Sequence, residues 1–251
     1  MQTFIHFGLV DVIGRRYVED CYMTVDQGLI QKVGPVGELR EEEKRGAVDL
    51  TGKTVMPGMF NCHIHALSTP IAAPESLNWE TSGMFALRGL RHLQQQLRSG
   101  VTFVRDMNGR KLAEVDLKNA LNQGLFEGPH YYIARKCLCM TGGHGSNTGR
   151  ECDGPVDCMK AAREQIKGGA DFVKIMATGG VNSDTRPEFS QLNLEEMTAA
   201  ITEAHRAGKK TATHAHGKAG IKTAVLAGID SVEHGSYLDD ECIDLMLERG
   251  T

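Results

Sequence analysis

The stretch NLEEMTAAITEAHRAGKKTATHAH, residues 193–216, places an amphipathic run, a glycine and a short apolar run in direct succession. Four apolar residues recur at helical spacing and share one face: Leu194, Met197, Ile201 and Ala204. Asn193 is a favourable N-cap, and Gly208 can end the helix in a left-handed conformation. The order helix, glycine, strand is typical of the βα units that surround a parallel sheet.

The same order recurs within residues 58–251, for example where FALRGLRHLQQQLRSG is followed by VTFVRD. Strands are predicted near residues 55–60, 101–105, 130–134, 171–176, 210–214 and 229–233. A (β/α)8 barrel contains eight such strands and places its active groups at their C-terminal ends. We therefore expect an α/β fold, a TIM-like (β/α)8 barrel of which about six strands are present and which is incomplete at its C-terminus.

Residues 1–57 have a different pattern. Short β-branched or alternating runs are separated by Gly, Asp and polar turns. Helical periodicity appears only weakly, near residues 37–45, where one short helical turn can form. We expect a small β-rich unit over residues 1–57 and the barrel over residues 58–251.

The composition excludes several classes of protein. With 251 residues, 41% of them hydrophobic, the chain can bury a sizeable core. A net charge of -4 without any Lys/Arg run argues against a nucleic-acid-binding surface. No signal-peptide pattern and no run long enough to span a membrane is visible, and seven scattered cysteines fit a reducing compartment. We expect a cytoplasmic protein with no nucleic-acid or membrane partner.

Side chains that bind metals fall at or near the ends of several predicted strands. His63 and His65 lie two residues apart, so both face the same way on an extended chain. His214 and His234 each end a later strand, and Lys174 lies within the apolar run DFVKIM. The C-terminal ends of parallel strands meet at one rim, and neutral imidazole is a common zinc ligand. The pattern therefore predicts a metal site.

Lys174 is unusual because an ammonium group in an apolar strand is poorly solvated, which lowers its pKa. In one interpretation the lysine stem packs in the strand and the charged head reaches solvent. In the other, a neutral amine takes up carbon dioxide to form a carbamate, whose two oxygens can bridge two cations about 3.5–4 Å apart. The neighbouring histidines favour the carbamate.

Five motifs occur in an order that resembles the amidohydrolase superfamily: VMPGMFNCHIH, GVTFVRD, GGADFVKIMATGGV, AHRAGKKTATHAHG and AGIDSVEHGSYLD. Within it, they are most similar to imidazolonepropionase-related, Xaa-Pro dipeptidase-like metal-dependent hydrolases. The resemblance implies a (β/α)8 barrel flanked by a β-sandwich, to which residues 1–57 contribute the N-terminal part. It also implies two divalent metal ions, usually zinc. His63 and His65 would bind one ion, carboxylated Lys174 would bridge, and His214 and His234 would bind the second.

The sequence departs from the family pattern in two places. Asn61 stands where the family commonly has Asp, two residues before the first histidine, and this change leaves the ligands themselves intact. The family's aspartate at the end of strand eight, which binds metal and moves the proton of the attacking water, has no counterpart in these residues. If 251 residues were the whole polypeptide, we would expect it to be inactive or badly folded.

Three more residues are candidate catalytic groups. His216 faces the same way as His214 on an extended chain, so the two compete for the metal; the resemblance assigns His214 to the metal and leaves His216 near the substrate. His144, in the glycine-rich loop TGGHGS, can contact a substrate carboxylate or an oxyanion, or is a solvated loop histidine. Tyr237 can polarise the scissile carbonyl through its hydroxyl, or packs at the rim.

Other polar residues are expected to be structural. Arg105 and Asp106 should pair with each other or with a neighbour, and Cys137 and Cys139 should pack rather than bind metal. Four histidines lie on strands or helix faces without other ligands nearby: His6, His92, His130 and His205.

The expected activity is that of a binuclear amidohydrolase that cleaves an amide or peptide-type bond through a metal-bridging hydroxide. Its partner would be a small molecule, a dipeptide or an N-acyl amino acid, and association into a homo-oligomer stays open. A mononuclear imidazolonepropionase-like cyclic amidohydrolase or a deaminase is the first alternative, since such a site needs no modified Lys174. The second is a metal-free scaffold protein, against which the five ligand-type side chains argue.

Overall fold

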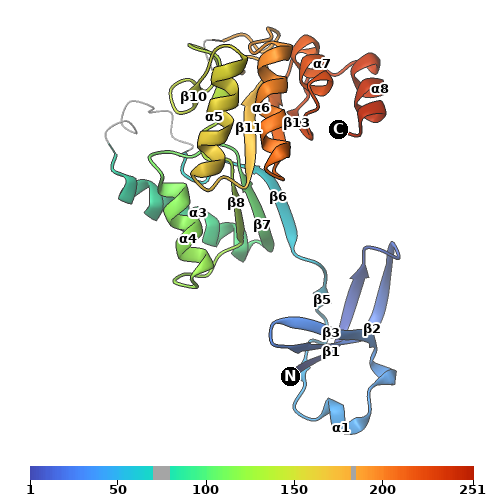
Figure 1. Cartoon of the computed structure of the whole chain (residues 1–251). Coiled ribbons are helices and arrows are strands. Elements are labelled where there is room, and N and C mark those ends of the chain that lie inside the picture. The colour runs from blue at the N-terminus through green and yellow to red at the C-terminus, as the bar shows by residue number, and fades with distance from the viewer. Residues whose placement is uncertain (70–79, 182–184) are drawn as a thin grey trace. The chain divides into compact units, whose positions relative to one another are not determined.

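The computed structural model describes residues 1–69, 80–181 and 185–251 (Figure 1). Within the chain, Met1–Gly58 and Met59–Thr251 form two compact units. No helix in the described ranges is both long enough and apolar enough to cross a membrane.

The first unit is a small sheet with short helices. Its strands are β1 (Gln2–Asp11), β2 (Arg16–Asp26), β3 (Leu29–Pro35), β4 (Val48–Asp49) and β5 (Thr54–Val55). β2 pairs antiparallel with β1 and β3, whereas β4 and β5 run parallel to β1. The 3-10 helix η1 (Val36–Glu38) and helix α1 (Glu41–Lys44) follow β3. A small core contains Ile5, Tyr22, Val36 and Leu39.

The strands of the second unit form two sheets in which every pair is parallel. The first sheet has the order β6 (Met59–Ile64), β7 (Val101–Asp106), β8 (His130–Ile133). The second has the order β10 (Arg150–Glu151), β9 (Leu138–Cys139), β11 (Phe172–Met176), β12 (Lys210–Ala215), β13 (Ser231–His234). The two are linked where Asp171 and Ile133 exchange hydrogen bonds of 2.8 and 3.0 Å.

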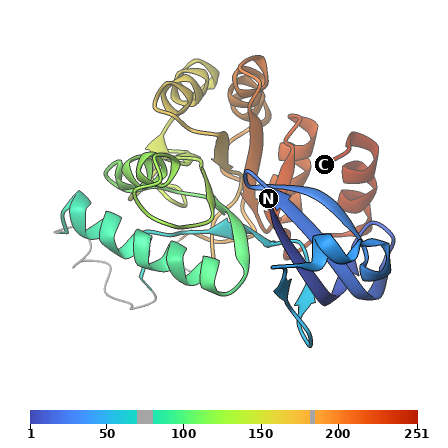
Figure 2. The same ribbon diagram turned by 90° about the horizontal axis from the view of Figure 1, so that it is seen from below.

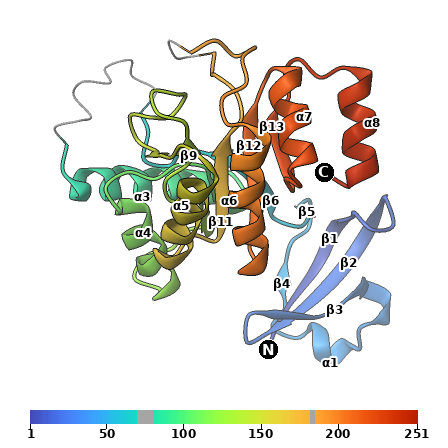
Figure 3. The same cartoon turned by 45° about the horizontal axis from the view of Figure 1, so that its top comes forward.

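Helices alternate with these strands along the chain and lie on their outer side. They are α3 (Ser82–Arg98), α4 (Ala113–Asn122), α5 (Pro155–Lys167), α6 (Leu194–Arg206), α7 (Lys218–Leu226) and α8 (Asp240–Arg249). Figure 2, which looks along the strands, shows the helices of this unit ranged around them. In Figure 3, α5 and α6 lie side by side in front of β11. The predicted α/β organisation with parallel strands is thus confirmed, and closure into a barrel stays a prediction.

The first predicted strand of this unit is misplaced. The sequence pattern puts it at residues 55–60, but β6 runs from Met59 to Ile64. Val55 instead pairs with Leu9 of the first unit's sheet, and Pro57 lies outside both strands. The shift brings His63 inside the strand and leaves His65 directly after it.

The helix signals around residue 193 are confirmed in detail. The Asn193 side chain accepts a hydrogen bond from the Glu196 amide at 3.0 Å, and the Glu196 carboxylate accepts one from the Asn193 amide at 2.8 Å. This reciprocal pair satisfies amides that a helix start would otherwise leave without partners. Gly208, with φ 67°, ends the turn in a left-handed conformation, and β12 begins two residues later.

The side chains of β11 alternate between two environments. Val173 and Ile175 belong to the large apolar core that also contains Met197 and Ile201 of α6. Lys174 therefore faces the opposite side of the strand, away from the helices. This alternation turns the lysine toward the region that the strands surround.

Candidate active site

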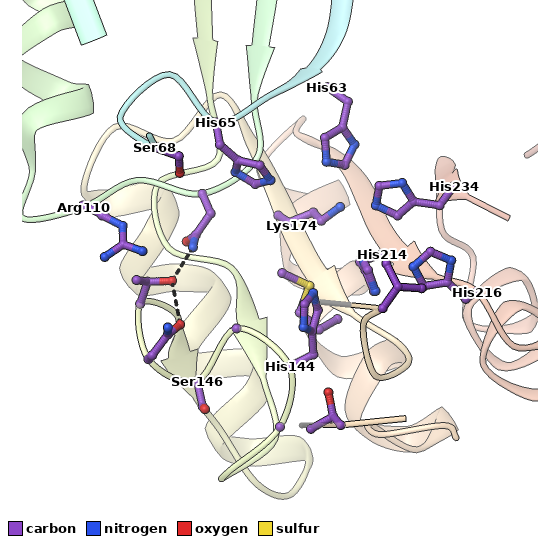
Figure 4. A pocket seen from close by; sticks show the side chains of 18 of the residues that line it. His63, His65, Ser68, Arg110, His144, Ser146, Lys174, His214, His216 and His234 are labelled. Carbon is purple, nitrogen blue, oxygen red and sulfur yellow. Dashed lines mark hydrogen bonds between the residues drawn. The ribbon is translucent and has the colours of Figure 1, made fainter. Parts of the chain in front are cut away.

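A cavity of about 910 Å³ lies at the C-terminal ends of the parallel strands (Figure 4). Six histidines and one lysine line it: His63, His65, His144, Lys174, His214, His216 and His234. They come from β6 and the residue after it, the loop after β9, β11, the end of β12 and the residue after it, and the end of β13. Of the residues proposed from the sequence, Tyr237 alone does not line the cavity.

The imidazole rings form a connected group. The ring centroids of His63 and His234 are 4.7 Å apart, and those of His214 and His234 are 4.8 Å apart. His65 lies 5.4 Å from His63 by the same measure. One nitrogen from each of His214, His216 and His234 can be chosen so that all three lie within 4.8 Å of one another. The structure thus brings histidines from β6, β12 and β13 together.

Lys174 is buried beside this group. Its residue is only 1% exposed, and its Nζ has no hydrogen-bond partner in the described part of the chain. Burial lowers the pKa of Lys174 to about 8, although Glu233 and Cys137 act in the opposite direction. A buried amine without a partner is costly, because a charged or polar group loses its water and gains nothing in return. These surroundings are those expected of a lysine whose amine binds a ligand or is covalently modified.

Three of the histidines, His65, His214 and His234, are neutral at physiological pH. His65 opens onto the cavity, yet desolvation by the protein around it, aided by the charges of His63 and Lys174, lowers its pKa to about 3. Burial lowers the pKa of His214 to about 2 and that of His234 to about 4. A neutral imidazole keeps one lone pair, which is the form that binds metal ions. The donor set is thus chemically suited to divalent metals.

The tautomer of His63 is fixed by Glu233. The His63 Nδ1 lies 2.8 Å from Glu233 Oε2, and because a carboxylate only accepts, Nδ1 carries the proton. Burial alone would raise the pKa of Glu233, but the bond to His63 and the charges of Lys174 and Arg105 lower it to about 2. In the neutral ring, Nε2 of His63 is therefore the nitrogen that keeps the lone pair. An ionised carboxylate that holds a histidine in this way is the usual support of a metal ligand.

Arg105 completes this arrangement. It donates to Glu233 Oε1 at 2.5 Å and to the Cys62 carbonyl at 2.7 Å, and so ties β7 to β6 and β13. Asp106 pairs elsewhere, accepting from the Tyr131 hydroxyl at 2.5 Å and from the Ala66 amide at 3.2 Å. Both residues thus pair with neighbours rather than with each other.

His214 and His216 differ in their partners. His214 Nε2 lies 3.0 Å from the Gly179 carbonyl, so Nε2 is the protonated nitrogen and Nδ1 keeps the lone pair. His216 Nδ1 lies 2.8 Å from Ser236 Oγ. The two rings are 4.7 Å apart, and both residues are about 95% buried. The two rings are therefore close enough for either one to bind the same metal ion, as the sequence pattern suggested.

His144 packs against the same group, with its ring centroid 4.3 Å from that of His214. A Cβ at Gly180 would lie 2.3 Å from His144 Cε1, so the ring needs a glycine there. Burial lowers the pKa of His144. Tyr237 lies further out, 46% exposed, with its ring centroid 6.4 Å from that of His216.

His234 has an unusual backbone. Its φ is 73°, a left-handed conformation that is strained for a residue with a Cβ. Strain of this kind occurs mainly at functional sites, where the surrounding structure holds it in place.

Glu233 is the main residue that the sequence analysis missed. It immediately precedes His234, and its carboxylate meets a histidine 170 positions earlier in the chain. A Glu in the short strand SVEH is as anomalous as Lys174 in DFVKIM, and that anomaly was the available signal. The histidines expected to be structural behave so where contacts are seen: His6 bonds Asp20, His92 the Ala66 carbonyl, and His205 Asp230.

These features define a class of protein: an α/β fold in which histidines from several parallel strands surround a buried lysine at the strands' C-terminal ends. The sequence model of the amidohydrolase family matches residues 54–251, and the chain therefore belongs to the amidohydrolase family.

Known relatives agree with this assignment. The chain is 30% identical to ochratoxinase from Aspergillus niger over 99% of its own length and 57% of that protein. A solved structure of a Xaa-Pro dipeptidase with bound methionine in the active site matches with a TM-score of 0.90 at 30% identity, over 100% of this chain and 65% of the other. Imidazolonepropionase from Pseudomonas putida is 42% identical over 50 residues, 20% of this chain and 12% of that protein. The chain thus spans roughly three fifths of the first two relatives, and the family resemblance is confirmed.

Proposed function

We propose that the protein is a metal-dependent hydrolase that cleaves an amide or peptide-type bond in a dipeptide or an N-acyl amino acid. The observation that carries this proposal is Lys174, a buried amine that has no hydrogen-bond partner within the described residues and lies among imidazole rings. The relatives named for dipeptide and ochratoxin chemistry support the same class of reaction.

Five side chains would hold two divalent ions, which we expect to be zinc. His63 and His65 would bind one, His214 and His234 the other, and a carboxylated Lys174 would bridge them. Bound there, the ions would supply an activated water and polarise the scissile carbonyl. The fit rests on the donor set: His65, His214 and His234 are neutral, and the Lys174 Nζ makes no hydrogen bond within the described residues.

Lys174 can acquire the carbamate by simple addition. The neutral amine attacks the carbon of carbon dioxide, so that the N–C bond forms as one C=O π bond opens. The nitrogen then gives one proton to solvent water, and the product is an anionic group with two oxygens. Burial favours the neutral amine that this addition needs, because it lowers the pKa of Lys174 to about 8. Arg105 holds Glu233, and Glu233 in turn orients His63 through Nδ1, so that Nε2 is the nitrogen available to a metal ion.

His216 and His144 are proposed to bind the substrate beside the metal ligands. Both line the cavity and both have lowered pKa values, so each is a neutral ring that can donate one N–H to a carboxylate or to a developing oxyanion. Tyr237 would assist only from the rim, in keeping with its exposure.

Proton transfer needs a further group. Among the described residues that line the cavity, none is Asp or Glu. The family resemblance assigns this step, from the water to the leaving amine, to an aspartate at the end of the eighth strand of a (β/α)8 barrel. We propose that the parallel strands belong to such a barrel and that the first unit is part of a β-sandwich.

A mononuclear hydrolase or deaminase is the second candidate. It is favoured by one observation: His214, His216 and His234 can bring three nitrogens within 4.8 Å of one another, enough for one ion without Lys174.

Metal content and intact mass of the full-length protein distinguish these candidates. Two ions per chain, with about 44 Da of acid-labile extra mass on the peptide that contains Lys174, would support the binuclear centre. One ion with unmodified Lys174 would favour the mononuclear enzyme. No metal after purification from zinc-supplemented medium would refute the hydrolase and leave the scaffold interpretation.

A further inference from the structure

Among the described residues, the charged side chains that line the cavity are basic. Two of the described residues that line it are basic chains of high intrinsic pKa, Lys174 and Arg110, and none is a carboxylic acid. In the proposed function Lys174 becomes an anion and serves the metals. Arg110 then remains as a cation whose role the reaction itself does not explain.

Arg110 lines the cavity and has no anionic partner among the residues that the structure describes. The residue is half-buried, and its guanidinium forms no ion pair or hydrogen bond with any residue that the structure describes. The guanidinium lies over the ring of Phe85, whose centroid is 5.9 Å from the Arg110 Cζ. Burial lowers the pKa of Arg110 and Arg88 lowers it further, whereas Glu80 acts in the opposite direction. Glu80 itself is engaged by Arg88 at 2.5 Å. A partly desolvated guanidinium without an anionic neighbour is stabilised when a bound ligand brings an anionic group to it.

The loop that carries Arg110 is built to hold it there. The Arg110 amide donates to Glu114 Oε2 at 3.0 Å, and the Gly109 amide donates to the Arg135 carbonyl at 2.7 Å. The next two residues, Lys111 and Leu112, have φ values of 52° and 65°. Consecutive left-handed residues other than glycine are strained, and such strain is kept where the surrounding structure fixes a functional geometry.

Neutral donors stand near Arg110. Ser68 and Ser146 line the same cavity, and in the view of Figure 4 Ser68 lies above the guanidinium and Ser146 below it. The Asn108 amide lies in the same lining and is bonded to Thr148 Oγ1 at 2.6 Å. Hydroxyl groups beside a guanidinium are suited to bind the oxygens of a carboxylate. In the same view Arg110 lies on the side of Lys174 opposite to His216, so it faces the part of a substrate that extends away from His216.

We propose that Arg110 binds an acidic group on the acyl part of the substrate, so that the preferred substrates are dipeptides whose N-terminal residue is Glu or Asp. This inference rests on the proposed function: His144 and His216 hold the C-terminal carboxylate, the scissile carbonyl lies at the metals, and Arg110 selects the side chain on the far side.

Two isosteric dipeptides, Glu-Leu and Gln-Leu, test the proposal on the full-length metal-loaded protein. We expect kcat/KM for Glu-Leu to exceed that for Gln-Leu at least about tenfold, the size of one charge-assisted contact. In Arg110→Met the ratio of these two kcat/KM values should fall to near one. In Arg110→Glu the reversed charge should make kcat/KM higher for Lys-Leu than for Gln-Leu. Arg91→Met, which changes an exposed arginine of α3, is the matched control and should keep the wild-type ratio. Equal rates for Glu-Leu and Gln-Leu in the wild type, or an unchanged ratio in Arg110→Met, would overturn the role of Arg110.

Binding to chelator-treated protein separates this inference from the hydrolase itself. Calorimetry of Glu-Leu and Gln-Leu needs no turnover, and the wild type should bind Glu-Leu at least about tenfold more tightly, a difference that Arg110→Met removes. If neither dipeptide is cleaved but this difference is present, the proposed function fails and the acidic specificity of Arg110 stands. If both are cleaved and bound without preference, the hydrolase stands and Arg110 has no such role.

Discussion

Glu233 carries the most direct prediction at the scale of single residues. Glu233→Gln keeps the size of the side chain and can still meet Arg105, but it no longer offers His63 an anionic acceptor. Loss of such a carboxylate typically weakens metal binding 10- to 100-fold, because the histidine is then less firmly oriented and less basic. We expect a loss of about this size in a competition titration of the full-length protein with a zinc chelator.

Ser231→Ala provides the control for Glu233. Ser231 also bonds the Glu233 carboxylate, at 3.1 Å, but the structure shows no contact between it and His63. It should change zinc affinity less than about threefold, because the carboxylate keeps its charge. Equal zinc affinities for wild type and Glu233→Gln would show that Glu233 serves the fold and not the metal ligand.

The strained backbone of His234 makes a second prediction. With φ at 73°, a residue with a Cβ pays a conformational cost that glycine avoids. In metal-free protein, His234→Gly should therefore be more stable than His234→Ala by about 1 kcal/mol, measured by urea unfolding. The two variants lose the same ring, so alanine is the matched control. An alanine variant that is as stable as the glycine variant would mean that the left-handed conformation is not strained.

At the scale of elements, Asp230 clamps the starts of β12 and β13. Its carboxylate accepts from Lys210 Nζ at 2.6 Å, from His205 Nε2 at 2.7 Å, and from both the amide and the hydroxyl of Thr211 at 2.8 Å. Burial would raise the pKa of Asp230, but these bonds lower it to about 2. The folded state thus prefers the carboxylate more strongly than the unfolded state does.

The lowered pKa of Asp230 determines how stability depends on pH. Asp230 contributes stability that is fully present above about pH 4 and is lost as pH falls toward 2. Asp230→Asn should reduce the free energy of unfolding at pH 7 by about 1–2 kcal/mol, and its difference from wild type should shrink as pH drops below 4. Urea unfolding across this range measures it, with the exposed Asp244→Asn as control. A difference that does not depend on pH would contradict the role of the charge.

Elements were predictable from the sequence where local patterns decide them. The amphipathic face, cap and glycine of α6 are local, and the structure has all three. β6 was misplaced because Val55 is equally suited to pair with Leu9, and that choice depends on residues far along the chain. The two-residue strands β9 and β10 carry too little pattern to be seen at all.

The candidate site shows the same division. Histidines at strand ends were visible because the C-terminal ends of parallel strands meet at one rim. The pairing of His63 with Glu233 was not visible, because it joins residues 170 positions apart and no local rule predicts it. Tyr237 was proposed from its position three residues after His234, but the turn after β13 leaves it half-exposed.

At the scale of the whole molecule, metal binding should be coupled to folding. A site that exists only in the folded state stabilises that state, by about 2.7 kcal/mol when the free ion is at 100 times its Kd. Removal of metal with a chelator should therefore lower the Tm of the full-length protein by roughly 5–10 °C, measured by calorimetry.

Two variants check that this shift comes from the cavity. The double variant with His63→Ala and His65→Ala should show little of the shift, because two of the four proposed histidine ligands are gone. His130→Gln, which changes an exposed histidine that does not line the cavity, should retain it. A chelator effect of equal size in both variants would place the stabilising ion elsewhere.

The arrangement of the parallel strands has a consequence for how these 251 residues behave in isolation. Within the described residues, β6 pairs only with β7 and β13 only with β12, so each presents one row of backbone amides and carbonyls without a neighbouring strand. Such open edges recruit strands from other molecules. This sequence alone, expressed as it stands, should therefore self-associate as its concentration rises, visible as growing light scattering. A covering strand, whether supplied by more of the same polypeptide or by another copy, would suppress it.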